Sequence, residues 1–259
     1  MKNWRLLVLL TGLFGLLPGG LVAQAGTGQD DPKATALIKG VEDKLNLENL
    51  DLTSTFTLVQ KKTGETDRVL KLRIYRRDRA GRFTIIFQYP DSEKGKGYFR
   101  DGDSLYLYLP TTREFVFRNR KDDVGSTDVR TDLFGKLNLS DQYRSKLIGS
   151  EKVAKFDTQV VQLDAKSLDV SFPIQKWYIR TSDGLPVKVE NFSASGTLLR
   201  TFFYVDYKEV APGKFLNTRL LAVNNLENNQ KTLLANDDVA TSKIADYTFS
   251  QAFLEEQSR

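Results

Sequence analysis

Residues 94–110 read KGKGYFRDGDSLYLYLP, and this stretch decides the fold. Two short runs rich in aromatic and aliphatic residues, 98–100 and 104–109, flank Asp101-Gly102-Asp103. Asp-Gly between two such runs is a strong signal for a β-hairpin. The run 104–109 is apolar or aromatic on both faces, which suits a strand that is covered on one side and lines a cavity on the other. The stretch therefore predicts a hairpin inside a β-rich domain.

The sequence on both sides of this hairpin alternates with the period of two that is typical of strands. Explicit turn residues such as Ser182-Asp183-Gly184 and Pro212-Gly213 separate the runs. We expect strands at 53–59, 69–75, 83–89, 114–118, 158–163, 174–180, 186–192, 198–207, 214–223 and 231–235. The prediction is a mainly β (α+β) fold, an open, strongly curved antiparallel β-barrel of about eleven strands.

Two segments break this pattern. Asp31-Pro32 opens a stretch with helical spacing, with Asp as the N-cap and Pro at the first helical position. Residues 119–143 begin polar and continue as an irregular or short-helical insertion between the two sets of strands. Long insertions in compact domains are often lids or binding loops. The insertion is therefore a candidate lid or binding loop.

The N-terminus predicts export. Lys2 and Arg5 precede the apolar run 6–17, and Ala23-Gln24-Ala25 resembles a signal peptidase site. We expect residues 1–25 to be a secretory signal peptide cleaved near Ala25, and 26–259 to be a single domain. A membrane anchor is the alternative, but a spanning helix needs about 20 apolar residues.

Composition excludes several kinds of chemistry. The chain has no His and no Cys, so Ser-His, Cys-His and most zinc sites are excluded. Its net charge of +5 comes without a concentrated basic patch, so we expect no nucleic-acid partner. We expect no cofactor, no metal and no catalysis.

Three carboxylate pairs are the remaining candidates for a hydrolytic or calcium site. They are Asp101 with Asp103, Asp122 with Asp123, and Asp237 with Asp238. We interpret the first as turn chemistry and the others as polar loops. The loop Lys94-Gly95-Lys96-Gly97 lacks P-loop spacing and no helix follows it, so we interpret it as a basic loop.

One face of the predicted sheet gathers apolar side chains, which form either a ligand cavity or an ordinary filled core. Periodicity alone does not distinguish the two. The candidate cavity residues are Phe56, Leu58, Leu70, Leu72, Ile74, Ile85, Phe87, Leu105, Leu107, Leu109, Trp177 and Ile179.

The stretch 94–110 resembles the LolA-like outer-membrane lipoprotein-sorting family, in which a glycine-bearing strand, an acidic turn and an aromatic strand ending in Tyr-x-Pro follow one another. Gly125-Ser126-Thr127-Asp128 and Asp132-Leu133 look like a further element of that family. The resemblance implies an apolar concave face that receives lipoprotein acyl chains or free lipid under a helical lid. It also implies a periplasmic, monomeric carrier between an inner-membrane transporter and an outer-membrane acceptor.

Applied to this sequence, the resemblance gives specific expectations. The lid candidates are Leu37, Ile38, Val41, Leu133, Phe134 and Leu137. The rim candidates for contact with lipid headgroups are Arg100, Arg113 and Arg118. Two alternatives stay open: a regulatory sensor of lipid or lipoprotein with the same fold, and a structural surface protein with a filled core.

Overall fold

The computed structural model describes residues 30–119, 122–227 and 230–258. The predicted signal peptide, 1–25, lies outside these residues. Three α-helices and four short 3-10 helices accompany the strands: α1 Pro32–Leu45, η1 Asp78–Ala80, η2 Val124–Ser126, η3 Thr131–Phe134, α2 Leu139–Gln142, η4 Asp246–Phe249 and α3 Gln251–Gln257. Among the described residues, the helices are all too short or too polar to cross a membrane.

All strands of the described chain join one antiparallel sheet. They are β1 Asp51–Lys61, β2 Arg68–Arg77, β3 Arg82–Tyr89, β4 Gly97–Asp101, β5 Ser104–Leu109, β6 Glu114–Arg118, β7 Tyr143–Val153, β8 Phe156–Ala165, β9 Ile174–Arg180, β10 Pro186–Phe192, β11 Leu198–Ala211, β12 Lys214–Asn224 and β13 Lys231–Thr241. Their order is β6-β5-β4-β3-β2-β1-β13-β12-β11-β10-β9-β8-β7. The first and last strands of the chain, β1 and β13, therefore pair in the middle of the sheet.

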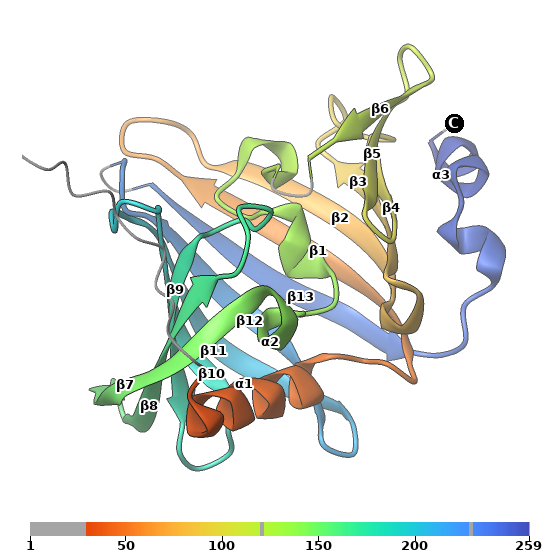
Figure 1. Cartoon of the computed structure of the whole chain (residues 1–259). Helices are drawn as coiled ribbons and strands as arrows, with labels where there is room; N and C mark the ends of the chain where they lie inside the picture. The colour runs from red at the N-terminus through yellow and green to blue at the C-terminus, as the bar shows by residue number, and fades with distance from the viewer. Residues whose placement is uncertain (1–29, 120–121, 228–229, 259) are drawn as a thin grey trace, which may run out of the picture.

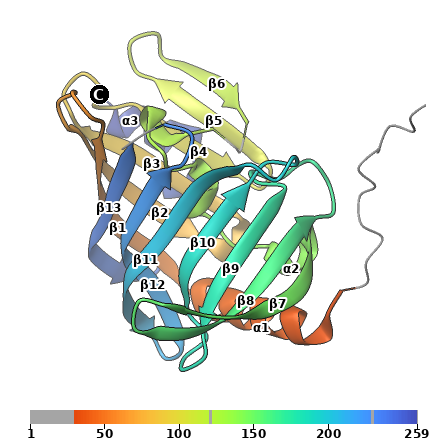
Figure 2. The ribbon, with the colours of Figure 1, turned by 90° about the vertical axis from the view of Figure 1, so that its left-hand side faces the viewer.

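The sheet is strongly curved and stays open between its edge strands β6 and β7 (Figures 1 and 2). This confirms the predicted open, curved antiparallel barrel with helical pieces. The structure has thirteen strands where the sequence predicts about eleven. The prediction misses β7 because this edge strand exposes most of its residues, so its sequence lacks the alternation of apolar and polar residues.

The hairpin that decides the fold forms as predicted. Residues 97–101 pair with 104–109 in antiparallel register, and Gly102 takes the left-handed conformation (φ 57°) that the tight turn needs. Leu105 packs in the main core on the concave side of β5. Tyr108 packs in a second cluster on the convex side. The strand is therefore covered on both faces, as its composition indicates.

The C-terminal segment covers part of the convex face. Helices η4 and α3 contact β3 and β4, and the Leu254 side chain is fully buried there beside Ile86 and Phe99. Gly97 makes this close approach possible, because a Cβ at this position would lie 2.3 Å from the carbonyl oxygen of Ile85 and 2.4 Å from Leu254. The C-terminal segment therefore packs against the outside of the sheet.

The cover of the concave face consists of α1 and the chain that links β6 to β7. Asp31 caps α1, accepting hydrogen bonds from the amides of Lys33 (2.9 Å) and Ala34 (3.4 Å). The helix contacts β7, β12 and α2. Residues 122–142 cross the concave side of the sheet as η2, η3 and α2 (Figure 1). We call α1 and residues 122–142 together the cover.

Candidate functional site

The concave face carries one continuous apolar cluster. Strand register explains it, because the inward residues of neighbouring strands stand opposite one another: Phe56 faces Leu72, and Ile74 faces Ile85. Ten predicted cavity residues belong to the cluster: Phe56, Leu58, Leu70, Leu72, Ile74, Ile85, Phe87, Leu105, Trp177 and Ile179. Leu107 packs against it. Leu109 lies beyond it at one end of the barrel.

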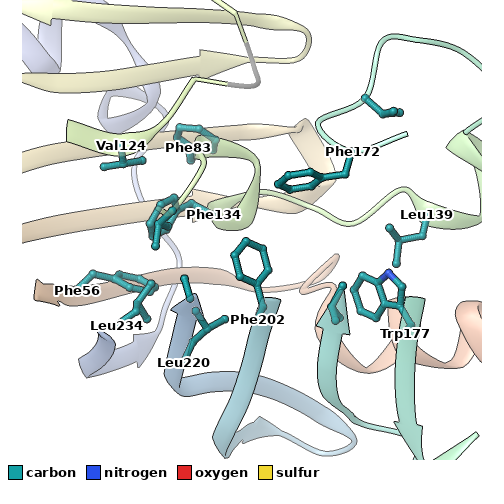
Figure 3. Packing of buried hydrophobic residues seen from close by; sticks show 14 of the residues in the cluster. Phe56, Phe83, Val124, Phe134, Leu139, Phe172, Trp177, Phe202, Leu220 and Leu234 are labelled. Carbon is teal, nitrogen blue, oxygen red and sulfur yellow. The ribbon is translucent and has the colours of Figure 1, made fainter. Parts of the chain in front are cut away.

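The predicted lid residues lie over this cluster. Ile38, Val41 and Phe134 are buried members of it, whereas Leu37, Leu133 and Leu137 are partly buried and pack against it. The Phe134 ring meets Phe56 of β1 edge to face, with the ring centroids 5.0 Å apart (Figure 3). The cover therefore inserts side chains into the barrel rather than lying above it.

Two small hollows remain between the cover and the sheet. The apolar hollow, about 80 Å³, lies among Leu45, Leu52, Phe56, Ile74, Leu133, Phe134, Leu137, Leu220 and Leu234. The polar hollow, about 120 Å³, is lined by Trp177 and Phe202 and by polar groups that include Arg100 and Asp132. Leu133, Leu137 and Tyr204 line both hollows, so they adjoin each other.

The two parts of the cover are tied to each other by polar contacts. The Asn46 side chain, at the end of α1, donates to the Leu137 carbonyl and accepts from the Leu137 amide. Glu42 of α1 accepts hydrogen bonds from the amide (2.9 Å) and the hydroxyl (2.7 Å) of Ser140. These contacts make α1 and residues 137–140 a connected unit.

Asp128 anchors the cover to the sheet. Its side chain is fully buried and accepts hydrogen bonds from Asn224 (3.1 Å), Gln230 (2.7 Å) and Thr232 (2.9 Å). Arg200 lies 3.6 Å away and balances its charge. A buried carboxylate is tolerated only with such partners, so residues 127–129 are fixed at one place on β11–β13.

Asp132, a second carboxylate of the cover, lies where burial disfavours its charge. Burial raises the pKa of Asp132, against the opposing effect of the hydrogen bond that the Ser171 hydroxyl donates to it. Arg130 also acts against the shift, and it donates to the Ser171 carbonyl at 2.7 Å. The folded state therefore disfavours the charged form of Asp132, which lines the polar hollow.

A larger cleft opens at the end of the barrel that holds the β1–β2, β3–β4 and β12–β13 loops. This mouth cleft has a volume of about 550 Å³. Its lining consists of Lys62, Arg68, Phe87, Glu93, Lys96, Tyr98, Leu107, Leu109, Arg118, Asp122, Asp123, Gly125, Ser126, Thr127, Arg200, Asn224, Glu227 and Gln230. Polar side chains surround an apolar floor of Phe87, Leu107 and Leu109.

The three predicted rim arginines do not come together. Arg118 lines the mouth cleft, whereas Arg100 lines the polar hollow inside the barrel. Arg113 is exposed in the β5–β6 turn, where its φ is 59°. Arg100 and Arg118 both stand opposite Leu105 in the strand register, but they line different hollows.

The carboxylate pairs have structural partners. Asp101 pairs with Arg82 at 2.6 Å, and Asp237 with Arg219 at 2.9 Å. Asp123 lies 3.7 Å from Arg130, and the two residues form a backbone bridge. Within the described ranges, the acidic side chains do not gather in groups of three that suit a metal ion.

Sequence reasoning missed much of the interior contributed by the second half of the chain, where it identified only Trp177 and Ile179. Phe172, Phe202, Leu220 and Leu234 all belong to the main cluster (Figure 3). In β11–β13, the apolar residues Phe202, Leu220 and Leu234 follow the period of two that is typical of strands. This pattern does not reveal that Thr232 also points inward, because a polar residue in an alternating strand is normally assigned to the solvent face.

These features define the class: an open, curved antiparallel barrel whose apolar concave face is closed by a helical cover, which is the LolA-like fold. A LolA superfamily protein from Nitrosomonas europaea superposes with a TM-score of 0.74 and 16% identity, covering 85% of this chain and 98% of that one. An outer membrane lipoprotein-sorting protein domain from Vibrio parahaemolyticus gives 0.77 and 16%, covering 86% and 98%. A DUF1329 family protein from Desulfovibrio piger gives 0.75 and 15%, covering 85% and 98%.

The sequence itself matches a family model over residues 80–256, more than half of the chain. That model is described as an uncharacterized protein family, and the chain belongs to it. No curated protein sequence matches the chain.

Proposed function

We propose that this protein is a non-enzymatic carrier that binds the acyl chains of lipoproteins or other lipids against its concave apolar face. One observation carries the proposal: the face is one continuous apolar cluster, and a connected cover of α1 and residues 122–142 closes it.

Binding requires the cover to move. Small-molecule pockets usually measure roughly 300–1,000 Å³, whereas the hollows inside this barrel measure about 80 and 120 Å³. An acyl chain would displace the side chains of Leu133, Phe134 and Leu137 and would pack against the apolar residues of the sheet that they contact. Each buried methylene contributes about 0.8 kcal/mol, so a chain that takes the place of these side chains compensates for their loss.

The remaining features of the proposal concern the cell. We propose that residues 1–25 direct export and that 26–259 act as one monomeric domain in the periplasm. It would accept cargo from an inner-membrane transporter and release it to an outer-membrane acceptor. The description of the Vibrio parahaemolyticus protein, a lipoprotein-sorting domain of the same fold, supports this route.

The first test is native mass spectrometry of the purified chain, followed by titration of the delipidated protein with a fluorescent fatty acid. A carrier copurifies with lipid or binds the probe saturably. A chain that carries no lipid and binds no probe contradicts the proposal and favours the structural protein with a filled core.

A crosslink tests the motion of the cover. Thr35 of α1 and Ser145 of β7 have their hydroxyl oxygens 2.8 Å apart, and the chain has no cysteine of its own. In the Thr35→Cys/Ser145→Cys variant, oxidation should slow probe uptake and reduction should restore it. The two single variants are the controls. Equal uptake rates in both redox states would show that α1 stays in place during loading.

A further inference from the structure

The mouth cleft differs from the interior in size and lining. At about 550 Å³ it falls in the range of ordinary ligand pockets without any movement of the cover. Its floor contains Phe87, Leu107 and Leu109, which continue the apolar face of the barrel to its end. A ligand with an apolar chain and a polar head therefore fits the junction between floor and wall.

Charges of both signs line the wall. The basic side chains are those of Lys62, Arg68, Lys96, Arg118 and Arg200, and the acidic ones are those of Glu93, Asp122, Asp123 and Glu227. A site for a purely anionic head needs no such acidic wall, because like charges would repel the ligand. The alternation of signs instead matches a head with one anionic and one cationic group.

Two ion pairs inside the cleft are long, whereas Lys96 pairs with Glu93 at 3.0 Å. Arg68 lies 3.4 Å from Glu93, and Arg118 lies 3.9 Å from Asp122, with all four side chains partly exposed. Pairs of this kind contribute little to stability, so a ligand can replace either partner. The side chains of Lys62 and Glu227 form no ion pair or hydrogen bond with other described residues, which leaves one charge of each sign for a ligand.

Gln230 adds a specific requirement. It is only 7% exposed, and its Nε2 donates to Asp128 Oδ1 at 2.7 Å. This contact with a carboxylate fixes the orientation of the amide, because the oxygen could not take that place. Among the described residues, the other atom, Oε1, has no hydrogen-bond partner although it is buried, and Gln230 lines the cleft. A buried acceptor of this kind needs a donor, which an incoming N–H group supplies.

We propose that the mouth cleft binds the zwitterionic head of an amphiphile, a phosphate together with a protonated primary amine, while its acyl chain runs over the Phe87–Leu107–Leu109 floor onto the concave apolar face. This inference rests on the proposed acyl-binding function and specifies its ligand. The arginines and lysines receive the phosphate, for which the guanidinium group has a matching geometry. The carboxylates and Gln230 Oε1 accept hydrogen bonds from the ammonium group.

Competition against the fluorescent fatty acid tests the inference with four lysolipids of equal chain length. Their heads are phosphoethanolamine, phosphocholine, phosphoglycerol and an uncharged glycerol. The phosphoethanolamine lipid should compete at least about tenfold better than the other three, because only it offers both a phosphate and N–H donors. The phosphocholine lipid has the same charges but no N–H group, so it isolates the role of the donor.

Two variants locate the effect. Glu227→Gln should reduce the preference for the phosphoethanolamine lipid over the phosphoglycerol lipid. Lys62→Gln should reduce the preference for the phosphoethanolamine lipid over the uncharged glycerol lipid. Each preference is measured as a ratio of affinities within one variant. Glu65→Gln and Lys39→Gln are matched controls that remove the same charges at exposed positions outside the cleft.

The outcomes separate the two proposals. If all four lysolipids bind within about twofold of one another, or if phosphoglycerol binds best, the headgroup inference is overturned while the acyl carrier stands. If no lysolipid and no fatty acid binds, the carrier itself fails and the inference fails with it.

Discussion

Asn46 and Leu137, 91 positions apart in the chain, exchange two hydrogen bonds. Asn46 Nδ2 donates to the Leu137 carbonyl at 2.9 Å, and the Leu137 amide donates to Asn46 Oδ1 at 2.8 Å. One side chain thereby satisfies the backbone of the segment that follows η3. The contact joins the end of α1 to the part of the cover that fills the barrel.

Asn46→Ala should loosen the cover. The Leu137 amide and carbonyl lose their partner, which costs about 1–3 kcal/mol of the free energy of unfolding. Uptake of a fluorescent fatty acid should become faster, because the closed state loses stability relative to the open one. Urea unfolding and stopped-flow fluorescence measure the two effects. Ser193→Ala, which removes hydrogen bonds within an exposed turn, should change neither.

Asp132→Asn should stabilise the protein at neutral pH. Burial raises the pKa of Asp132, so the folded state disfavours its charge. For a raised carboxyl pKa, this penalty grows as the pH rises from the unfolded value, roughly 3.9, through the folded value. The variant should therefore unfold at higher urea concentration than the wild type at pH 7. Near pH 3 the two should agree, and a constant difference at both pH values would contradict this assignment.

Protonation of Asp51 in acid should destabilise the folded protein, which is the opposite of the effect expected for Asp132. Burial alone would raise its pKa, but hydrogen bonds from Arg77, the Ile244 amide and Arg79 outweigh this and hold the pKa well below its usual value. A lowered pKa contributes stability above roughly pH 4 that is lost as the pH falls toward the folded value.

Asp51→Asn should therefore cost about 3 kcal/mol at pH 7, because buried Arg77 keeps only the exposed Asp246 as a charge partner. It should also flatten the loss of stability below pH 4, which urea unfolding across pH measures. Asp101→Asn is the matched control. Its pair with Arg82 is 2.6 Å long but exposed, so the cost should stay below about 1 kcal/mol.

Gly97→Ala should destabilise the protein by about 1–3 kcal/mol or more. The added Cβ meets the Ile85 carbonyl oxygen at 2.3 Å, and this backbone atom has no way to rotate aside. The C-terminal helix α3 should detach and become sensitive to protease. Gly40→Ala in α1 makes the same change in open space and should stabilise the helix by up to about 1 kcal/mol. An intact C-terminus in Gly97→Ala would contradict the packing role of Leu254.

The interior illustrates how far the sequence predicts the site. Leu70, Leu72 and Ile74 alternate so regularly that their common face follows from the period of a strand. Helix α1 follows from Asp31, Pro32 and the spacing after them. The polar anchor at Asp128 was not predictable, because its partners Asn224, Gln230 and Thr232 come together only when β12 and β13 are paired.

The sequence by itself determined the hairpin at residues 97–109, the helix after Asp31 and the apolar face of β1–β5. These depend on local periodicity and turn chemistry, which act over a few residues. Only the tertiary structure decided that β1 pairs with β13, that Phe134 fills the barrel and that Arg100 and Arg118 lie in different hollows. These relationships join residues far apart in the chain, and the curvature and register of the whole sheet determine them.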